Sequence, residues 1–147
     1  KEFPVQDDLV VVVESEDFER NRQFVERLGA YLEGETNLLT GISGSGATDV
    51  WVVTAYNAMA GAASIIHYDG AMWKTIANNI PDFLSAVAVT AGEVWAVGTN
   101  GALWRSTGGA FTRQSTGTTS NLNWAYTSGA NEAWAVGDSG VILRREP

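Results

Sequence analysis

The side chain best suited to acid–base chemistry is the single histidine, His67, which is followed by Tyr68 and Asp69. A catalytic base must lie within hydrogen-bond reach of the group that it deprotonates, and no nucleophile motif such as G-x-S-x-G accompanies this histidine. One histidine and no cysteine exclude a metal site with several imidazole or thiolate ligands, and no D-x-D-x-D-G calcium loop is present. We expect His67 to be exposed or to support a turn, and the chain to have no catalytic residue, metal ion or cofactor.

Three acidic residues, Asp49, Glu93 and Glu132, occupy equivalent positions in related stretches, each two residues before a tryptophan. In a ring-shaped protein they would form a circle of carboxylates at one rim, which could bind a cation. Carboxylates that accept backbone N–H bonds in turns explain the same pattern more simply. We favour that turn role.

The aromatic residues fall into two groups. Three tryptophans recur at equivalent positions in the middle of apolar stretches and are predicted to be structural core: Trp51, Trp95 and Trp134. Four other aromatic residues are candidates for a surface binding site where sugar rings could stack: Trp104, Trp124, Tyr56 and Tyr126. Packing in a core or an interface explains these four more simply than sugar binding.

The charge of the chain is −8 and is unevenly distributed over its 147 residues. Residues 1–36 carry ten acidic and four basic side chains, a net −6, and residues 37–147 carry seven and five, a net −2. Sparse, scattered lysine and arginine disfavour nucleic-acid binding, which needs clustered cations. No apolar run approaches the roughly 20 residues of a transmembrane helix. The absence of cysteine suits an extracytoplasmic location (periplasmic, secreted or cell surface), which we expect.

The elements that position these residues come from a threefold repeat. The stretch GEVWAVGTNGALW at 92–104 recurs as NEAWAVGDSGVIL at 131–143, with a weaker copy, TDVWVVTAYN, at 48–57. A period of about 40–50 residues is typical of propeller blades or solenoid units. Within each unit, short runs of valine, tryptophan and isoleucine are separated by glycine, asparagine and threonine, a pattern that predicts hairpins.

The predicted fold is therefore mostly β, with propeller-type blades of four-stranded antiparallel sheets. The blades are expected over residues 37–80, 81–120 and 121–147, the last without its fourth strand. Their second strands are apolar on both faces, as expected when each sheet packs between two neighbours.

Two further stretches carry a family resemblance. IIHYDGAMW at 65–73 and LWRSTGGAF at 103–111 look like degenerate forms of the Asp-box, or BNR, turn. The longer VWAVGTNGALWRSTGGAF resembles repeats of bacterial surface propellers and of the photosystem II assembly-factor propeller family. The resemblance covers residues 37–147, and it implies that Asp69 shapes the bend between the third and fourth strands while Trp73 or Phe111 fills the core.

Sialidase-like propellers also carry such boxes and use an arginine cluster in catalysis. The blades contain four arginines with no spacing that marks a carboxylate clamp: Arg105, Arg113, Arg144 and Arg145. Fold analogy alone does not confer activity. We expect no enzymatic function.

Residues 1–36 form an acidic strand-helix extension. Leu9 to Val13 is apolar and reads as a strand, and the following stretch predicts a helix with Ser15 as its N-cap and Gly34 at its end. One apolar stripe on that helix is predicted from four residues: Phe18, Val25, Leu28 and Leu32. The helix either packs on its own chain, which we favour, or docks a partner.

Three blades do not close a ring, since closed propellers have about four to eight. Either the chain is part of a longer propeller, or two chains share a six-bladed ring. Lys1 to Gln6 resembles the fourth strand of the second unit and could complete the third. The predicted function is a non-catalytic interaction or assembly module that binds a protein partner or a second copy. The alternative is a lectin-like propeller with carbohydrate sites between its blades.

Overall fold

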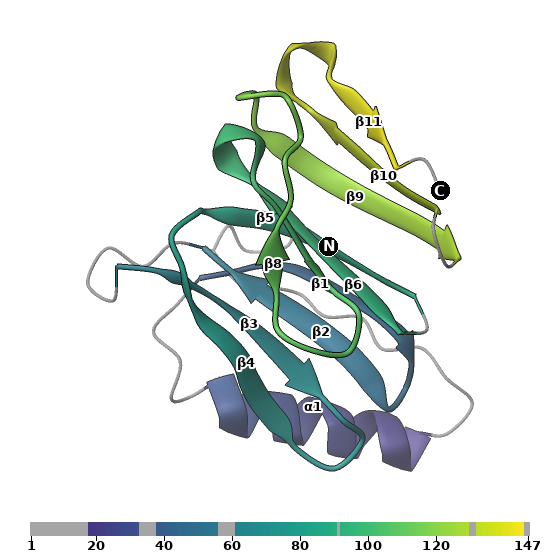
Figure 1. Ribbon diagram of the computed structural model, residues 1–147. Helices are drawn as coiled ribbons and strands as arrows, with labels where there is room; N and C mark the ends of the chain where they lie inside the picture. Colours follow the sequence, from purple (N-terminus) through teal and green to yellow (C-terminus); the bar gives the residue numbers. More distant parts are fainter. Residues whose placement is uncertain (1–17, 33–37, 56–60, 91, 130–131, 146–147) are drawn as a thin grey trace, which may run out of the picture. The chain divides into compact units, whose positions relative to one another are not determined.

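The computed structural model describes residues 18–32, 38–55, 61–90, 92–129 and 132–145 (Figure 1). The chain divides into two compact units, Lys1–Glu35 and Thr36–Pro147. In the first unit the helix α1 spans Phe18–Leu32. Arg22 pairs there with Glu19 at 2.5 Å and with Glu26 at 2.6 Å, one turn away on either side.

The helix α1 lies within the stretch predicted to be helical. Val25, assigned to its apolar stripe, is 50% exposed. The proposed end residues Ser15 and Gly34, the predicted strand at 9–13 and the proposed closing strand at 1–6 all lie outside the described residues.

The second unit consists of three antiparallel sheets, which we call the first, second and third blade. The first has the strand order β1-β2-β3-β4, with the bounds Leu39–Gly46, Asp49–Thr54, Ala63–Tyr68 and Trp73–Ile80. The second has the order β5-β6-β7-β8, with the bounds Leu84–Thr90, Glu93–Gly98, Leu103–Ser106 and Thr112–Arg113. The third has the order β11-β10-β9, over Ile142–Arg144, Glu132–Gly137 and Leu122–Gly129. The mostly-β fold with blade-like sheets is confirmed.

Apolar side chains fill the two spaces between consecutive blades. Between the first and second blades the core includes Val53, Ala63, Ile65, Ile80, Leu84, Val87, Val94 and Ala96. Between the second and third it includes Ala86, Ala88, Val97, Leu122, Ala125 and Ala135. Every residue of β6 is buried. Because successive side chains of a strand point to opposite faces, β6 presents Val94 and Ala96 to one neighbour and Trp95 and Val97 to the other.

The turn after β3 depends on Asp69. Its Oδ1 accepts the backbone N–H groups of Ala71 and Met72, both at 3.0 Å, and its Oδ2 accepts Lys74 Nζ at 2.5 Å. The lysine and the two backbone donors hold the pKa of Asp69 well below its usual range. Trp73, which follows this turn, is 7% exposed. Both the turn role of Asp69 and the buried Trp73 agree with the sequence prediction.

The hairpin turn between the second and third strands is repeated in the second and third blades. The backbone N–H of Gly98 donates to Ala102 O at 3.0 Å, and that of Gly137 donates to Val141 O at the same distance. Both glycines have extended backbones, with φ of −170° and −160°. Their need for glycine is therefore steric, because a Cβ on Gly98 would lie 1.8 Å from Phe83 O and one on Gly137 would lie 1.9 Å from Asn121 O.

We expect Gly98→Ala to destabilise the chain by at least about 2 kcal/mol, because the added methyl meets backbone atoms that can move only with β5. Gly109→Ala is the matched control, since a Cβ there meets nothing within 4 Å. Urea denaturation of both variants measures the difference. Equal stability of the two variants would contradict the close approach of β5 to the turn.

Candidate functional site

Each blade carries the same three kinds of side chain at one end of its middle strands. An acid begins the second strand, a tryptophan follows two residues later, and a base stands opposite the tryptophan on the third strand. The three sets are Asp49, Trp51 and His67; Glu93, Trp95 and Arg105; and Glu132, Trp134 and Arg144. Residues two apart in a strand share a face, and residues opposed across strands are neighbours. The repeat therefore places one acid–tryptophan–base group on each blade.

In the first blade the group centres on Asp49. Its Oδ1 accepts the indole N–H of Trp51 at 2.8 Å and also lies 2.8 Å from His67 Nε2. The rings of Trp51 and His67 stack with centroids 4.0 Å apart. Burial alone would raise the pKa of Asp49, but hydrogen bonds from Ser45, Trp51 and His67 outweigh it and lower the pKa.

In the second blade Glu93 is bound by arginines from two blades. Arg105, on β7 of the same blade, donates from Nη2 to Glu93 Oε1. Arg145, just after β11 of the third blade, donates from Nη1 to both carboxylate oxygens at 3.1 and 3.2 Å. Both arginines lie over the ring of Trp95, with the guanidinium carbons of Arg105 and Arg145 5.1 and 5.3 Å from its centroid. These contacts join the second blade to the third at one charged centre.

In the third blade the acid and the base of the corresponding group, Glu132 and Arg144, are exposed to solvent. Arg144 lies over the ring of Trp134, with its guanidinium carbon 5.2 Å from the centroid. Glu132 accepts a hydrogen bond from Ser128 Oγ at 2.6 Å. The hydrogen bonds from Ser128 and Trp134 and the charge of Arg144 lower the pKa of Glu132. Glu132 is exposed, whereas its counterpart Glu93 is buried.

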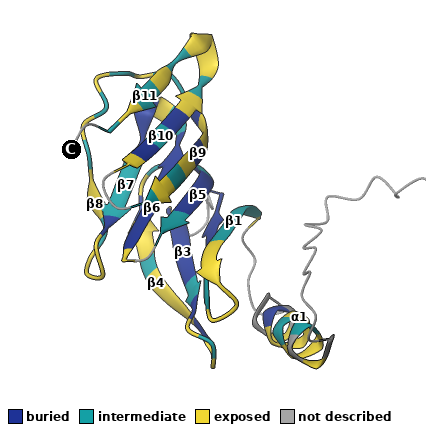
Figure 2. Cartoon of the chain, turned by 90° about the vertical axis from the view of Figure 1, so that its right-hand side faces the viewer, coloured by how far each residue is buried: buried dark blue, intermediate teal, exposed yellow. Residues whose placement is uncertain are grey.

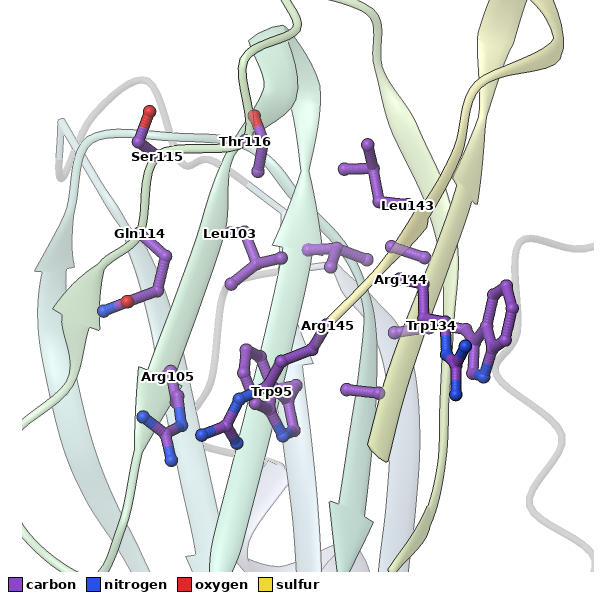
Figure 3. Close-up of a pocket in the computed structure, with 14 residues that line it drawn as sticks. Trp95, Leu103, Arg105, Gln114, Ser115, Thr116, Trp134, Leu143, Arg144 and Arg145 are labelled. Atoms are coloured by element: carbon purple, nitrogen blue, oxygen red, sulfur yellow. The ribbon is translucent and has the colours of Figure 1, made fainter. Parts of the chain in front are cut away.

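A cleft of about 260 Å³ opens between the second and third blades (Figure 3). Figure 3 shows Trp95, Arg105 and Arg145 gathered at one end of this cleft, and Arg144 and Trp134, which also line it, beside the strands of the third blade. The Nε atom of Arg105 is buried and has no hydrogen-bond partner among the described residues. The polar residues Gln114, Ser115 and Thr116 line one side of the cleft. Its apolar lining consists of Val97, Leu103, Ala125, Ala133, Ala135 and Leu143.

The fold has counterparts among solved structures. YCF48 from Cyanidioschyzon merolae matches with a TM-score of 0.60 and 22% identity, over 77% of this chain and 38% of that one. A structure of YCF48 bound to a D1 peptide matches with a TM-score of 0.61 and 17% identity, over 76% of this chain and 38% of that one. The chain has a β-propeller fold. Its predicted resemblance to the photosystem II assembly-factor propellers is confirmed at the level of the fold.

The chain thus spans well under half the length of the YCF48 chains that it matches. No protein-family model and no curated protein matches its sequence. In the parts of the chain that the structure describes, no three histidine, cysteine, aspartate or glutamate side chains are grouped to hold a metal ion. Over the same residues, no helix has the length and apolarity required to cross a membrane.

The acidic residues at the start of the second strands differ from their predicted role. Asp49, Glu93 and Glu132 were assigned to turns as acceptors of backbone N–H groups. Within the described contacts, their carboxylates instead bind side chains: the indoles, the hydroxyls of Ser45 and Ser128, and the bases His67 and Arg105. Register decides this outcome, because the acid and the tryptophan share a face of the strand and the base stands directly opposite.

The aromatic residues predicted to form a surface site do not lie together. Trp104 is half-buried, donates its indole N–H to Asp82 at 2.9 Å and packs against the core between the first and second blades. Trp124 and Tyr126 lie on β9 and are 65% and 58% exposed. Tyr56 lies outside the described residues. Of the three tryptophans predicted to be core, Trp95 is buried, at 6% exposure, and Trp51 and Trp134 are half-buried.

Sequence reasoning missed the convergence of Arg105 and Arg145 on Glu93. The sequence does contain a signal for the contact between Arg105 and Glu93. Arg105 and Arg144 stand opposite repeat-equivalent tryptophans, so each could have been paired with the acid of its own blade. Arg145 comes from 52 residues away, and only the stacking of the blades brings it to Glu93.

Glu93 is expected to make the fold sensitive to acid. Burial alone would raise the pKa of Glu93, but hydrogen bonds from Arg105 and Arg145 and their charges outweigh it, so the pKa falls below its ordinary value of 4.5. A carboxylate with a lowered folded-state pKa stabilises the fold above the unfolded-state value, and this contribution is lost as the pH falls through the folded-state pKa.

We expect Glu93→Gln to lower the free energy of unfolding at pH 7 by about 1–3 kcal/mol, because two arginines lose their charged acceptor. Below pH 4.5 the difference from the unsubstituted chain should shrink. Urea denaturation between pH 7 and pH 3 measures both. A difference that does not change with pH would mean that the carboxylate charge of Glu93 does not stabilise the fold.

Proposed function

We propose that the chain is a non-catalytic, propeller-type interaction module that binds an acidic segment of a protein partner in the cleft between its second and third blades. The observation that carries the proposal is the placement of Arg105 and Arg145 beside Trp95 at the end of an apolar cleft. Two guanidinium groups and one carboxylate leave this end with a net positive charge, in a chain whose total charge is −8.

The donors of the cleft suit an acceptor-rich ligand. A guanidinium group has five N–H donors, and the contacts with Glu93 use one nitrogen of each arginine. The arginines are 24% and 25% exposed, so solvent or a ligand reaches part of each guanidinium group, although Arg105 Nε is buried. Stacking on Trp95 and pairing with Glu93 hold both guanidinium groups in place, which reduces the side-chain entropy lost on binding.

The shape of the cleft fits part of a polypeptide. A volume of about 260 Å³ accommodates a few side chains, and alanine and leucine side chains along the third blade provide apolar contact. A partner segment with one or two carboxylates next to apolar residues would meet both features. The solved YCF48 structure with a bound D1 peptide supports a peptide-binding role for this fold. The extracytoplasmic location stays a prediction.

A carbohydrate-binding role has weaker support. The most exposed aromatic pair, Trp124 and Tyr126, has Val136 and Ile142 as exposed neighbours on the same sheet. Sugar sites combine an aromatic face with several polar groups that recognise hydroxyls. The aliphatic neighbours instead favour an apolar contact, and we do not extend the proposal to carbohydrates.

A display library of random linear decapeptides, with the full chain as bait, tests the proposed function. We expect recovered sequences to be enriched in aspartate and glutamate beside leucine, isoleucine or aromatic residues. Recovery should fall when 0.5 M NaCl is added, because salt screens the arginine charges. No enrichment over a bait-free selection, or enrichment in lysine and arginine, would contradict the proposal.

A further inference from the structure

The outward face of the third blade, on the side away from the second blade, exposes four large apolar side chains. Trp124 and Tyr126 on β9 are 65% and 58% exposed, Val136 on β10 is 41% exposed and Ile142 on β11 is 67% exposed (Figure 2). The register places Trp124 opposite Val136 and Val136 opposite Ile142. These four residues therefore form a continuous apolar surface across three strands, which we call the β9 face.

The β9 face is the third copy of a surface that is covered in the other two blades. Its repeat equivalents on the second blade are Ala86, Ala88, Val97 and Leu103, which pack against the third blade. On the first blade, the equivalents of Val136 and Ile142 are Val53 and Ile65, which pack against the second blade. Large exposed apolar patches mark interaction surfaces. Continuity with the two internal interfaces thus indicates that the β9 face also has a partner.

The partner cannot pack as a regular blade does. On the first blade the positions equivalent to Trp124 and Tyr126 are Gly41 and Ser43, and on the second they are Ala86 and Ala88. A Cβ added to Gly41 would lie 2.9 Å from Ala86 Cα, so the first and second blades leave no room there even for a methyl group. The second and third blades accommodate the methyl groups of Ala86 and Ala88 at the equivalent positions. An indole and a phenol at these positions exclude the same stacking.

The charges at the edge of the β9 face are self-complementary. Glu132 is exposed, whereas its counterpart Glu93 receives Arg145 from the next blade. Arg144, also exposed, lies on the same face over Trp134. A two-fold axis through the face can bring Glu132 of one copy to Arg144 of the other. The same symmetry then also pairs Arg144 of the first copy with Glu132 of the second.

We propose that the β9 face is a homodimer interface in which two copies pack face to face around a two-fold axis. Aromatic rings provide the centre, because offset or edge-on packing of Trp124 and Tyr126 against their copies requires no close strand approach. Buried aromatic side chains contribute about 150–250 Å² each, and a stable dimer buries about 800 Å² per partner. The four apolar residues supply the centre of such an area, and the polar residues of β9 and β10 supply its rim.

This arrangement differs from a shared six-bladed ring, which would stack the third blade on a first blade as neighbouring blades stack. It is also distinct from the proposed peptide cleft. Trp134 and Arg144 at the edge of the β9 face line that cleft, but none of the four residues of the β9 face does. Loss of the dimer would leave peptide binding unchanged, and loss of peptide binding would leave the dimer unchanged.

Sedimentation equilibrium of the full chain, from about 1 to 300 µM, tests the proposal. We expect a dimer of twice the 15.7 kDa chain mass. We expect Ile142→Asp to weaken dimerisation at least about tenfold, since buried apolar anchors dominate interface energies. Ile76→Asp is the matched control, because Ile76 is an isoleucine on β4 that is 42% exposed, and it should leave the dimer unchanged.

A second variant, Tyr126→Asp, tests the same interface at another residue, and we expect it to weaken dimerisation as well. Circular dichroism shows whether each variant is folded. A chain that stays monomeric at 300 µM would overturn the proposal. A dimer that resists both Ile142→Asp and Tyr126→Asp, or one that Ile76→Asp disrupts equally, would also overturn it.

Discussion

Replacing Trp95 by alanine is expected to lower the free energy of unfolding by about 3–5 kcal/mol, the usual cost of truncating a buried aromatic side chain. Trp95 is 6% exposed and stands on β6, the strand whose residues are all buried. Its ring also supports the guanidinium groups of Arg105 and Arg145. The substitution therefore removes apolar contact and the support of the charged centre together.

Trp134→Ala is the matched comparison. Trp134 occupies the equivalent position in the repeat, but it is half-buried and supports Arg144 alone among the described cation–π contacts. We expect its replacement to cost less than half as much at protein concentrations where the chain is monomeric. Urea denaturation followed by circular dichroism measures both variants. A Trp95→Ala chain as stable as the unsubstituted one would show that Trp95 is not core.

Replacing Arg145 by glutamine is expected to weaken binding of the acidic peptides recovered from the library by about 10- to 100-fold, the loss that corresponds to one charged hydrogen bond. Arg145 contributes a cation from the third blade at the end of the cleft where Arg105 comes from the second blade, and Arg144 also lines the cleft. Its removal leaves Arg105 to share its donors between Glu93 and the ligand. Isothermal titration calorimetry measures the dissociation constants.

Arg113→Gln is the control for this substitution. Arg113 is 45% exposed, pairs with Asp82 at 3.1 Å and does not line the cleft. The Arg113→Gln substitution removes one positive charge from the chain, as Arg145→Gln does. A loss of affinity caused only by the change in net charge would therefore appear in both variants. Equal affinities of the Arg145→Gln and Arg113→Gln chains would place the ligand elsewhere.

Most of the blade architecture could be predicted because its determinants are local. The sequence AVGTNGA and its copy AVGDSGV each encode a turn with one non-glycine residue at positive φ, Asn100 at 55° and Ser139 at 59°. Apolar residues on both sides of β6 predicted a sheet between two others, and the structure has this arrangement.

The site could be predicted only in part, because its determinants are distant in the chain. Trp104 was a candidate for a surface site because it breaks the repeat, with packing in a core or an interface as the simpler explanation. It packs against the core, and Asp82, 22 residues earlier, accepts its indole N–H. The pairing of Arg145 with Glu93 likewise depends on how far the third blade lies from the second. No local sequence pattern predicts the distance between two blades. The base opposite each tryptophan, in contrast, could have been predicted from hairpin register alone.

The most direct test of the cleft is a nuclear magnetic resonance titration of the full chain with one of the recovered acidic peptides, observing the indole N–H signals of its six tryptophans. Single tryptophan-to-phenylalanine variants assign the signals. We predict that the Trp95 signal shifts most, because its indole N–H donates to Glu93 at the arginine end of the cleft, and that the Trp73 signal stays in place. An unchanged Trp95 signal at saturating peptide, or a largest shift at Trp124, would contradict the cleft as the binding site.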